Sequence, residues 1–324
     1  MSIICQEWQI KATEDWELTK LLHQDNCTIY HEIINQSVIW SNNPDIYLDD
    51  RLIKWLDRLK NFRPLLEADI VISDNLSGVL AVRPDAILMG SFLWLDILKI
   101  HKKVPKVKEF IDFEKSLLKK KPPMLCVGTI AMPAVFEYTH AIPLPWFGLS
   151  PKSTPKIRRE QKIIALVGGA TPAADDILLS IANELLEKSN YTLTMSAKFF
   201  SRITSMDTTR LYPFGFQQKD YEACDLVICR PGIGTITECM VSNTPMLLIP
   251  EISNSEMVHN TNRLVELGMA YALPSYFSTN DLLKALEFIF KPDIFDSMAQ
   301  IIEKQEVNGF EAAVKWIIQY RHLN

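Results

Sequence analysis

Short apolar runs of strand length recur along the chain, each followed by a polar turn and an amphipathic stretch. The runs occupy residues 69–73, 86–89, 162–167, 191–195, 225–229 and 245–249. Two of the amphipathic stretches, residues 175–187 and 281–290, place their leucines and isoleucines on one helical stripe. Short apolar strands alternating with such helices predict α/β architecture with parallel sheets.

Two domains are expected, because 324 residues exceed what one hydrophobic core usually serves. The boundary is expected within residues 142–159, where four prolines interrupt regular structure and basic side chains keep the chain solvated. These residues are Pro143, Pro145, Pro151, Pro155, Lys152, Lys156, Arg158 and Arg159. We expect a first domain over residues 1–150, a second over 151–305, and a last helix over 306–324 that packs back on the first domain.

Composition narrows the class of protein without indicating a function. Apolar residues make up 48% of the chain and charged residues 23%, with a net charge of -5, as in an ordinary globular protein. The slight acidity disfavours nucleic acid as a partner, so the lysine-rich residues 102–121 are interpreted as a solvated face.

Cysteine spacing and the amino terminus point to a cytoplasmic location. The six cysteines contain no CxxC pair and no His spacing suited to zinc, which indicates reduced thiols and no metal site. The opening residues lack the pattern of a signal peptide, and no apolar stretch approaches the roughly 20 residues that span a bilayer. We therefore expect a cytoplasmic protein without a transmembrane segment.

The first of three polar turns follows the run 162–167 and reads Gly168-Gly169-Ala-Thr-Pro before a helix. Bare backbone amides at the carboxyl edge of a sheet, beside a helix amino terminus, suit a phosphate group. A Gly-Gly pair after a strand is more often a simple tight turn, so this signal is weak by itself.

The second turn runs from Arg230 to Glu238 and reads Arg-Pro-Gly-Ile-Gly-Thr-Ile-Thr-Glu. Gly232 and Gly234 would let the backbone approach a ligand closely. In one interpretation Thr235 and Glu238 only form a capping box for the following helix. In the other, the amides near Gly234 and Thr235 bind a diphosphate and the Glu238 carboxylate binds paired ribose hydroxyls. The residues alone leave both interpretations open.

The third turn follows the run 245–249 and contains Glu256, His259 and Asn260 before an expected helix over residues 261–267. A polar loop at this edge can bind sugar hydroxyls. A lone His at a helix start is usually structural, but three consecutive turns converge on one sheet edge. Their convergence predicts a ligand site.

Two of these turns resemble motifs of the GT-B glycosyltransferases, in particular the type that includes the peptidoglycan N-acetylglucosaminyltransferase and the UDP-glycosyltransferases. Residues 225–238, Asp-Leu-Val-Ile-Cys-Arg-Pro-Gly-Ile-Gly-Thr-Ile-Thr-Glu, are similar to the family's "aDlvisrpGyGTisE" turn. Residues 243–260 are similar to its "tPmllvP…e…HNa" segment. The resemblance covers about residues 45–275 and is fainter in the first domain.

The resemblance implies an α/β fold of two Rossmann-like domains whose parallel sheets face each other across a cleft. It implies that Glu238 holds the ribose, that glycine-rich turns flank the diphosphate, and that the third turn lies near the donor sugar. The implied donor-binding residues are Gly168, Gly169, Arg230, Gly232, Gly234, Thr235, Glu238, Glu256, His259 and Asn260.

The amino terminus departs from the family pattern. Residues 1–8 resemble the family's second strand, and its first strand, Gly-rich loop and helix are not visible. The first domain is therefore expected to be incomplete, and a partner chain or a second copy is expected to cover the sheet position left open. Asp74 is then the best-placed candidate for a catalytic base.

The sequence thus predicts a glycosyltransferase that moves a sugar from a nucleotide donor, expected to be a UDP-sugar, to an acceptor it does not identify. Backbone amides and a helix dipole would stabilise the departing diphosphate, so neither a metal nor a cofactor is expected. Two alternatives stay open: a nucleotide-sugar hydrolase or epimerase, and a catalytically silent nucleotide-sugar-binding subunit of a partner enzyme.

Overall fold

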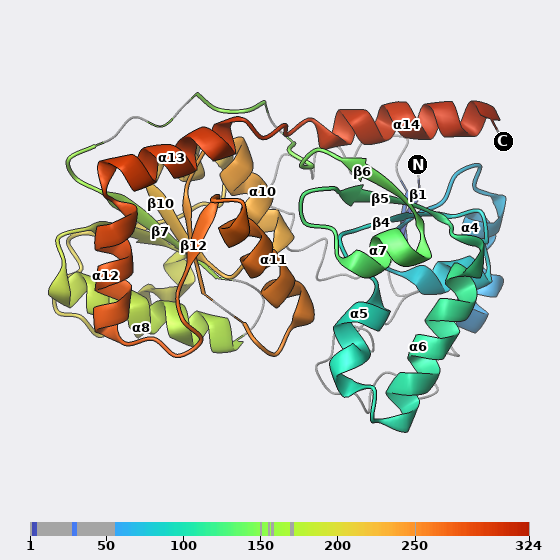
Figure 1. Ribbon diagram of the computed structural model, residues 1–324, viewed down its shortest axis with the longest axis horizontal. Helices are drawn as coiled ribbons and strands as arrows, with labels where there is room; N and C mark the ends of the chain where they lie inside the picture. The colour runs from blue at the N-terminus through green and yellow to red at the C-terminus, as the bar shows by residue number, and fades with distance from the viewer. Residues whose placement is uncertain are drawn as a thin grey trace. The chain divides into compact units, whose positions relative to one another are not determined.

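The structure is a computed structural model that describes residues 2–4, 28–30, 56–149, 151–154, 156, 159–168, 172–249 and 251–323. The described chain forms two compact units (Figure 1). The first draws on Met1–Cys126 and Ala131–Ile142, and the second on Val127–Ile130 and Pro143–Asn324.

The first unit contains a four-stranded sheet in the order β3-β4-β5-β6. Its strands are β3 (Ile72–Asp74), β4 (Ile87–Met89), β5 (Pro123–Val127) and β6 (His140–Leu144). β3, β4 and β5 run parallel, as the sequence predicts. Two further strands, β1 (Ser2–Ile4) and β2 (Thr28–Tyr30), form a separate parallel pair.

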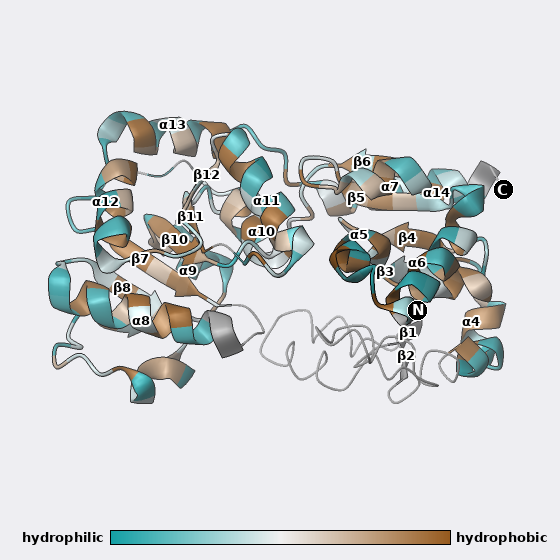
Figure 2. Cartoon of the chain, turned by 60° about the horizontal axis from the view of Figure 1, so that its bottom comes forward, coloured by the Kyte–Doolittle hydropathy of each residue, from teal (hydrophilic) through white to brown (hydrophobic). Residues whose placement is uncertain are grey.

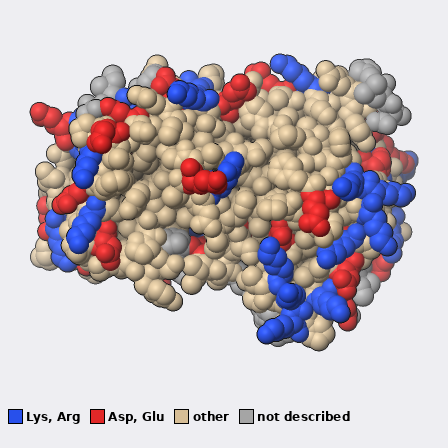
Figure 3. Space-filling model, in the orientation of Figure 1, with Lys and Arg blue, Asp and Glu red and all other residues tan. Residues whose placement is uncertain are grey.

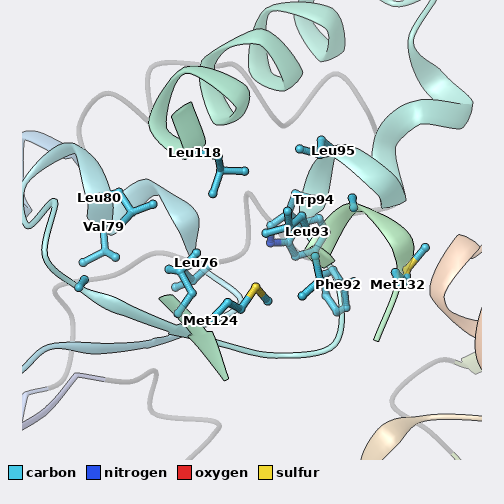
Figure 4. Packing of buried hydrophobic residues seen from close by; sticks show 14 of the residues in the cluster. Leu76, Val79, Leu80, Phe92, Leu93, Trp94, Leu95, Leu118, Met124 and Met132 are labelled. Atoms are coloured by element: carbon cyan, nitrogen blue, oxygen red, sulfur yellow. The ribbon is translucent and has the colours of Figure 1, made fainter. Parts of the chain in front are cut away.

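Short helices pack around this sheet and share one apolar core. They are α4 (Arg63–Glu67), η3 (Ser77–Ala81), α5 (Trp94–Leu98), η4 (Lys99–His101), α6 (Pro105–Leu117), η5 (Leu118–Lys120) and α7 (Pro133–Tyr138). Figure 4 shows side chains of η3, α5 and η5, together with Met124 of β5, pointing into this core. The burial of these side chains is the main stabilising contribution to the unit.

β6 corrects one expectation from the sequence. The prolines from Pro143 onward were expected to interrupt regular structure from residue 142, yet the strand continues to Leu144. The physical reason is that β6 is the edge strand of its sheet, where a missing N–H need not break the ladder.

The second unit is built on a six-stranded parallel sheet in the order β12-β11-β10-β7-β8-β9. Its strands are β7 (Ile163–Val167), β8 (Thr192–Met195), β9 (Leu211–Pro213), β10 (Leu226–Cys229), β11 (Met246–Leu248) and β12 (Ala270–Ala272). The four apolar runs predicted from 162 onward are all strands of this sheet. The edge strands β9 and β12 were not expected.

Helices cover both faces of this sheet. They are α8 (Pro172–Lys188), η6 (Ala197–Arg202), α9 (Gln218–Ala223), α10 (Ile233–Val241), α11 (Ser255–Glu266), α12 (Thr279–Ile289) and α13 (Pro292–Glu303). Ile164 and Leu166 of β7 pack with α8 and α12, whereas Ala165 and Val167 pack with α9 and α10. The brown faces of these helices in Figure 2 are the apolar stripes that the sequence predicts. The arrangement is a doubly wound α/β unit.

The segment after β6 is bound to the second unit, which corrects the expectation of a solvated linker. Lys152 donates to the carbonyls of Ile302 and Gln305, both at 2.6 Å, at the carboxyl end of α13. Lys156 donates to three carbonyls, those of Tyr221, Glu222 and Cys224, at 2.7 to 2.9 Å, at the end of α9. The two lysines satisfy helix carboxyl ends, and burial lowers the pKa of each to about 8.

Two surface features concern the sequence predictions. Figure 3 shows Lys and Arg side chains gathered over the region of α5 and α6, where the described lysines between 102 and 121 are exposed, as expected of a solvated face. Among the described residues, no helix has the length and apolar character needed to cross a bilayer.

The last helix, α14 (Gly309–Leu323), begins close to its predicted start. Ala313 on its apolar stripe is buried, whereas Phe310, Val314 and Ile318 are 39%, 54% and 52% exposed. Its expected packing on the first domain stays a prediction.

Candidate functional site

The three predicted turns leave neighbouring strands of the second unit. β7, β10 and β11 are adjacent and parallel, with Val167 paired with Cys229 and Cys229 paired with Leu248. Because parallel strands end at the same edge, Gly168, Arg230 and the segment from Glu251 all lie at the carboxyl edge of the sheet. This is the edge at which open α/β sheets bind ligands.

The helix that follows β10 has an open amino terminus. Gly232 is the N-cap of α10 and has no side chain with which to cap the helix. The amide of Ile236 makes the first helical hydrogen bond, to the Gly232 carbonyl at 3.0 Å. The amides of Ile233, Gly234 and Thr235 precede that bond and so have no acceptor within the helix. The capping box of Thr235 and Glu238 is therefore wrong, because the helix begins two residues before Thr235.

The two glycines of this turn are not required by the protein's own packing. A Cβ atom added at Gly232 or Gly234 would meet nothing within 4 Å. Gly232 has an ordinary extended backbone, with φ -77° and ψ 140°. Glycine within a helix costs about 1 kcal/mol relative to alanine. The glycines leave open space directly beside the uncapped amides, which suits a ligand.

Gly168 differs from these two glycines. A Cβ atom at this position would lie 2.9 Å from Asp175 Oδ1 and 2.9 Å from Leu178 Cδ1 of α8. A residue with a Cβ atom at this position would therefore require the ends of these two side chains to shift. Gly169, the second glycine of the turn, lies outside the described residues, and the role of both in binding diphosphate stays a prediction.

Glu238 lies on α10, four residues after Gly234, and residues with that spacing share a helix face. The rise between them is about 6 Å along the helix axis. This distance is comparable to the length of one phosphate and part of a ribose. Burial raises the pKa of the Glu238 carboxyl. A partly buried carboxylate on the same face as the open amides is suited to accept hydrogen bonds from paired hydroxyls.

The third turn is shorter than expected. α11 begins at Ser255 rather than at residue 261, so Glu256, His259 and Asn260 lie on a helix and not on a loop. The reason is Asn254, whose side chain accepts from the amides of Glu256 and Met257 at 2.9 and 3.3 Å. An Asn just before the apolar stripe of this helix was a signal that the sequence reasoning missed.

Asn260 has a structural role in this arrangement. Its side chain is fully buried and donates to the Pro231 carbonyl at 2.9 Å. This bond ties α11 to the turn before α10. Its expected place near the donor sugar stays a prediction, as do those of Glu256 and His259.

Arg230 is engaged by a residue that the sequence reasoning did not single out. Its guanidinium forms a bidentate ion pair with Glu251, from Nε to Oε2 and from Nη2 to Oε1, the latter at 3.1 Å. Nothing in the local sequence pairs these residues, because they are 21 positions apart and follow different strands. The paired arginine presents little net charge to a ligand.

Asp74 stands at the end of β3 in the first unit. Its carboxyl accepts from Asn75 Nδ2 at 3.1 Å, and its side chain is accessible to solvent. Protein atoms around the carboxyl partly desolvate it, which raises the pKa of Asp74. A raised pKa is a property of many general bases, so the structure keeps Asp74 a candidate without assigning its role.

Among the described residues, no group of three or more His, Cys, Asp or Glu side chains is arranged to hold a metal ion.

Known proteins share both the sequence pattern and the fold. Residues 164–313 match the glycosyltransferase family 28 C-terminal domain. The glycotransferase of kitacinnamycin superposes with a TM-score of 0.65 at 14% identity, covering 99% of this chain and 91% of that one. For Acinetobacter baumannii MurG the TM-score is 0.61 at 15% identity, with 98% and 99% covered.

Curated relatives at the sequence level carry one name, UDP-N-acetylglucosamine--N-acetylmuramyl-(pentapeptide) pyrophosphoryl-undecaprenol N-acetylglucosamine transferase. The relative from Ruminiclostridium cellulolyticum is 28% identical over 118 residues, 35% of this chain and 32% of the relative. The relative from Gloeothece citriformis is 27% identical over 158 residues, 45% and 42%. The matched region thus spans less than half the length of these relatives.

The fold is that of the GT-B glycosyltransferases, which confirms the α/β fold class predicted from the sequence. The segment 164–313, which matches the glycosyltransferase family 28 C-terminal domain, contains the open turn of α10 and the Arg230–Glu251 pair.

Proposed function

We propose that the protein is a glycosyltransferase whose second unit binds a nucleotide-activated sugar, a UDP-sugar, without a metal ion. The observation that supports this most is the open amino terminus of α10, with Gly232 and Gly234 leaving space beside three amides. The same turn lies in the segment that matches the family 28 domain. Relatives named as UDP-N-acetylglucosamine transferases support uridine as the nucleoside.

In this mechanism the amides of Ile233, Gly234 and Thr235 donate hydrogen bonds to the diphosphate, aided by the positive end of the α10 dipole. Glu238 accepts hydrogen bonds from the ribose hydroxyls and fixes the nucleoside along the helix. As the bond from the sugar to the diphosphate breaks, negative charge grows on the phosphate oxygens beside these amides, and the fixed dipoles stabilise it. Asp74 is proposed to take the proton from the acceptor hydroxyl.

The test is a calorimetric and thermal-shift titration with UDP, UDP-N-acetylglucosamine, dTDP and ADP, run in parallel in buffer containing MgCl2 and in buffer containing EDTA. A ligand at 100 times its Kd stabilises the folded state by about 2.7 kcal/mol. We expect UDP and its sugar to stabilise the parent protein and to bind Glu238→Ala at least tenfold more weakly. The matched control is Glu187→Ala, which removes an exposed carboxylate from α8.

Two outcomes would contradict the proposal. A folded parent protein that binds none of the nucleotides would remove the donor site altogether. Binding that disappears with EDTA would overturn the metal-independent mechanism. Where binding is seen, incubation of the nucleotide sugar with candidate acceptor lipids and saccharides distinguishes transfer from hydrolysis and from binding without turnover.

A further inference from the structure

The ion pair between Arg230 and Glu251 borders the open amino terminus of α10. Arg230 is the first residue after β10, and Glu251 lies in the segment between β11 and α11. Both oxygens of the carboxylate are engaged by one guanidinium. The two side chains are 17% and 21% exposed, so solvent screens the pair less than it screens a surface pair. A bidentate pair fixes direction as well as distance.

A second contact joins the same two elements. Asn260 of α11 donates to the carbonyl of Pro231, the residue after Arg230, at 2.9 Å. The segment 251–254 is thus held at its start by the ion pair, and α11, which follows the segment, is held to the same turn by a buried hydrogen bond. Between the two ties, Ile252 is 62% exposed and Ser253 is exposed as well. The segment presents side chains to solvent while its two ends are fixed.

The amino termini of α10 and α11 differ at this edge. The side chain of Asn254 accepts hydrogen bonds from the first amides of α11, whereas the N-cap of α10 is Gly232, which has no side chain to do so. The first amides of α10 are therefore available to an anion. The segment before α11 can then contact the group that the anion carries. For a nucleotide sugar, that is the sugar.

We propose that the Arg230–Glu251 pair is a positioning clamp for the sugar end of the donor. The inference rests on the proposed function and deepens it. The clamp sets the distance between the diphosphate-binding amides of α10 and the segment 251–254. Glu251 neutralises Arg230, so the guanidinium acts on the donor through the position of Glu251 and not through its own charge.

The experiment compares Arg230→Met, Glu251→Gln and the double substitution in binding UDP and UDP-N-acetylglucosamine by calorimetry. Each single substitution breaks the clamp with little change in side-chain volume. We expect each to weaken UDP-N-acetylglucosamine binding on the order of tenfold relative to UDP, since displaced contacts are costly. The Kd of UDP should stay within about twofold in Arg230→Met and be equal or lower in Glu251→Gln, which leaves the guanidinium unneutralised. The double substitution is expected to be no worse than either single one, because the clamp is already broken.

The matched control is Arg202→Met, which breaks an ion pair with Asp176 of α8 in the same unit. Its side chains are 50% and 68% exposed, and its nitrogen and oxygen are 2.6 Å apart. This variant is expected to bind both nucleotides as the parent does. Folding of all variants is checked by circular dichroism and by the unfolding midpoint.

The outcomes separate the clamp from the function on which it rests. Equal loss of UDP and UDP-N-acetylglucosamine in Arg230→Met, with additive effects in the double variant, would show direct contact with the diphosphate and overturn the clamp. Unchanged binding in both single variants would overturn it too. Failure of the parent protein to bind any nucleotide would overturn the proposed function, and the clamp's role in donor binding with it.

Discussion

The two units differ in what lies at the amino termini of their helices. In the first unit, Glu114 of α6 accepts from the amide of Leu95 at 2.5 Å and so occupies the start of α5. Asp96 accepts from the amide of Ala134 at 3.2 Å and occupies the start of α7. In the second unit, the N-cap of α10 is Gly232, which has no side chain to occupy the start of the helix.

The difference bears on the proposed donor site. Orphan amides at a helix start are satisfied by a side chain, by water or by a ligand. Glu114 is only 1% exposed, and Ser77 also donates to it at 2.6 Å, so the start of α5 is closed from within. The start of α10 faces open space at Gly232 and Gly234. The protein thus closes one helix start with its own carboxyl group, whereas the other is the start at which we propose that the diphosphate of the donor binds.

The largest effect on stability is expected from removing the buried Glu114 carboxyl. Glu114→Ala leaves the hydroxyl of Ser77 and the amides of α5 without their acceptor inside a packed core. We expect a loss of about 3 kcal/mol in the free energy of unfolding, measured by urea denaturation. UDP binding by the folded fraction should be unchanged. A loss below about 1 kcal/mol would mean that water replaces the carboxylate.

The same residue predicts a pH dependence. Burial, opposed by hydrogen bonds from Ser77 and the α5 amides and assisted by the negative charge of Asp96, raises the pKa of Glu114 to about 7. The unfolded carboxyl titrates near its ordinary value of 4.5. Between these values the folded state binds more protons than the unfolded state, so this group makes the folded state less stable as pH rises. The slope is at most about 1.4 kcal/mol per pH unit.

Glu114→Gln removes this titration while keeping an acceptor for the α5 amides. The difference in unfolding free energy between parent and variant should therefore change across the window from about pH 4.5 to 7 and be flat outside it. The measurement is urea denaturation at intervals of half a pH unit. A constant difference over the whole range would show that Glu114 does not titrate there.

Carbonyl oxygens at the carboxyl ends of helices need partners, as the amides at the amino termini do. Lys156→Met deprives three carbonyls at the end of α9 of a charged donor. We expect a loss of about 2 kcal/mol in the free energy of unfolding. The matched control is Lys219→Met on α9 itself, which is expected to change stability by less than about 0.5 kcal/mol. Equal effects of the two substitutions would show that the carbonyls are solvated in the parent.

The comparison can be tested most directly by giving the first turn of α10 a carboxylate of its own. Gly234→Asp places a carboxylate in the first turn of the helix, as Glu114 does for α5. We expect UDP to bind at least tenfold more weakly, while the free energy of unfolding rises by about 1 kcal/mol from the helix dipole and the loss of glycine. Gly234→Ala is the control, because it adds a methyl group without charge. Undiminished UDP affinity in Gly234→Asp would place the diphosphate elsewhere.

Strands buried in the middle of the second sheet could be predicted from the sequence. β7, β10 and β11 are covered on both faces, so each reads as a continuous apolar run. β9 and β12 could not be predicted, because they are edge strands of three residues in which Tyr212 and Tyr271 remain exposed. β5 was missed although its run Met-Leu-Cys-Val carried the same signal as its neighbours.

The candidate site was predictable in part. The glycine-rich turn after β10 and the position of Glu238 follow from local spacing alone. The start of α11 at Ser255 depends on Asn254, a local signal that was overlooked. The partner of Arg230 has no local signal, because Glu251 reaches it only when β10 and β11 pair in parallel.

The sequence by itself determined the buried central strands of the second sheet, the α/β class, and the turn at which a nucleotide sugar is proposed to bind. These depend on periodicity and on residues that are neighbours along the chain. The tertiary structure decided which helix starts are closed and which stay open, and it paired Arg230 with Glu251 and Lys156 with the end of α9. Such contacts join residues far apart in sequence, and their energies depend on burial and distance, which exist only once the sheet has formed.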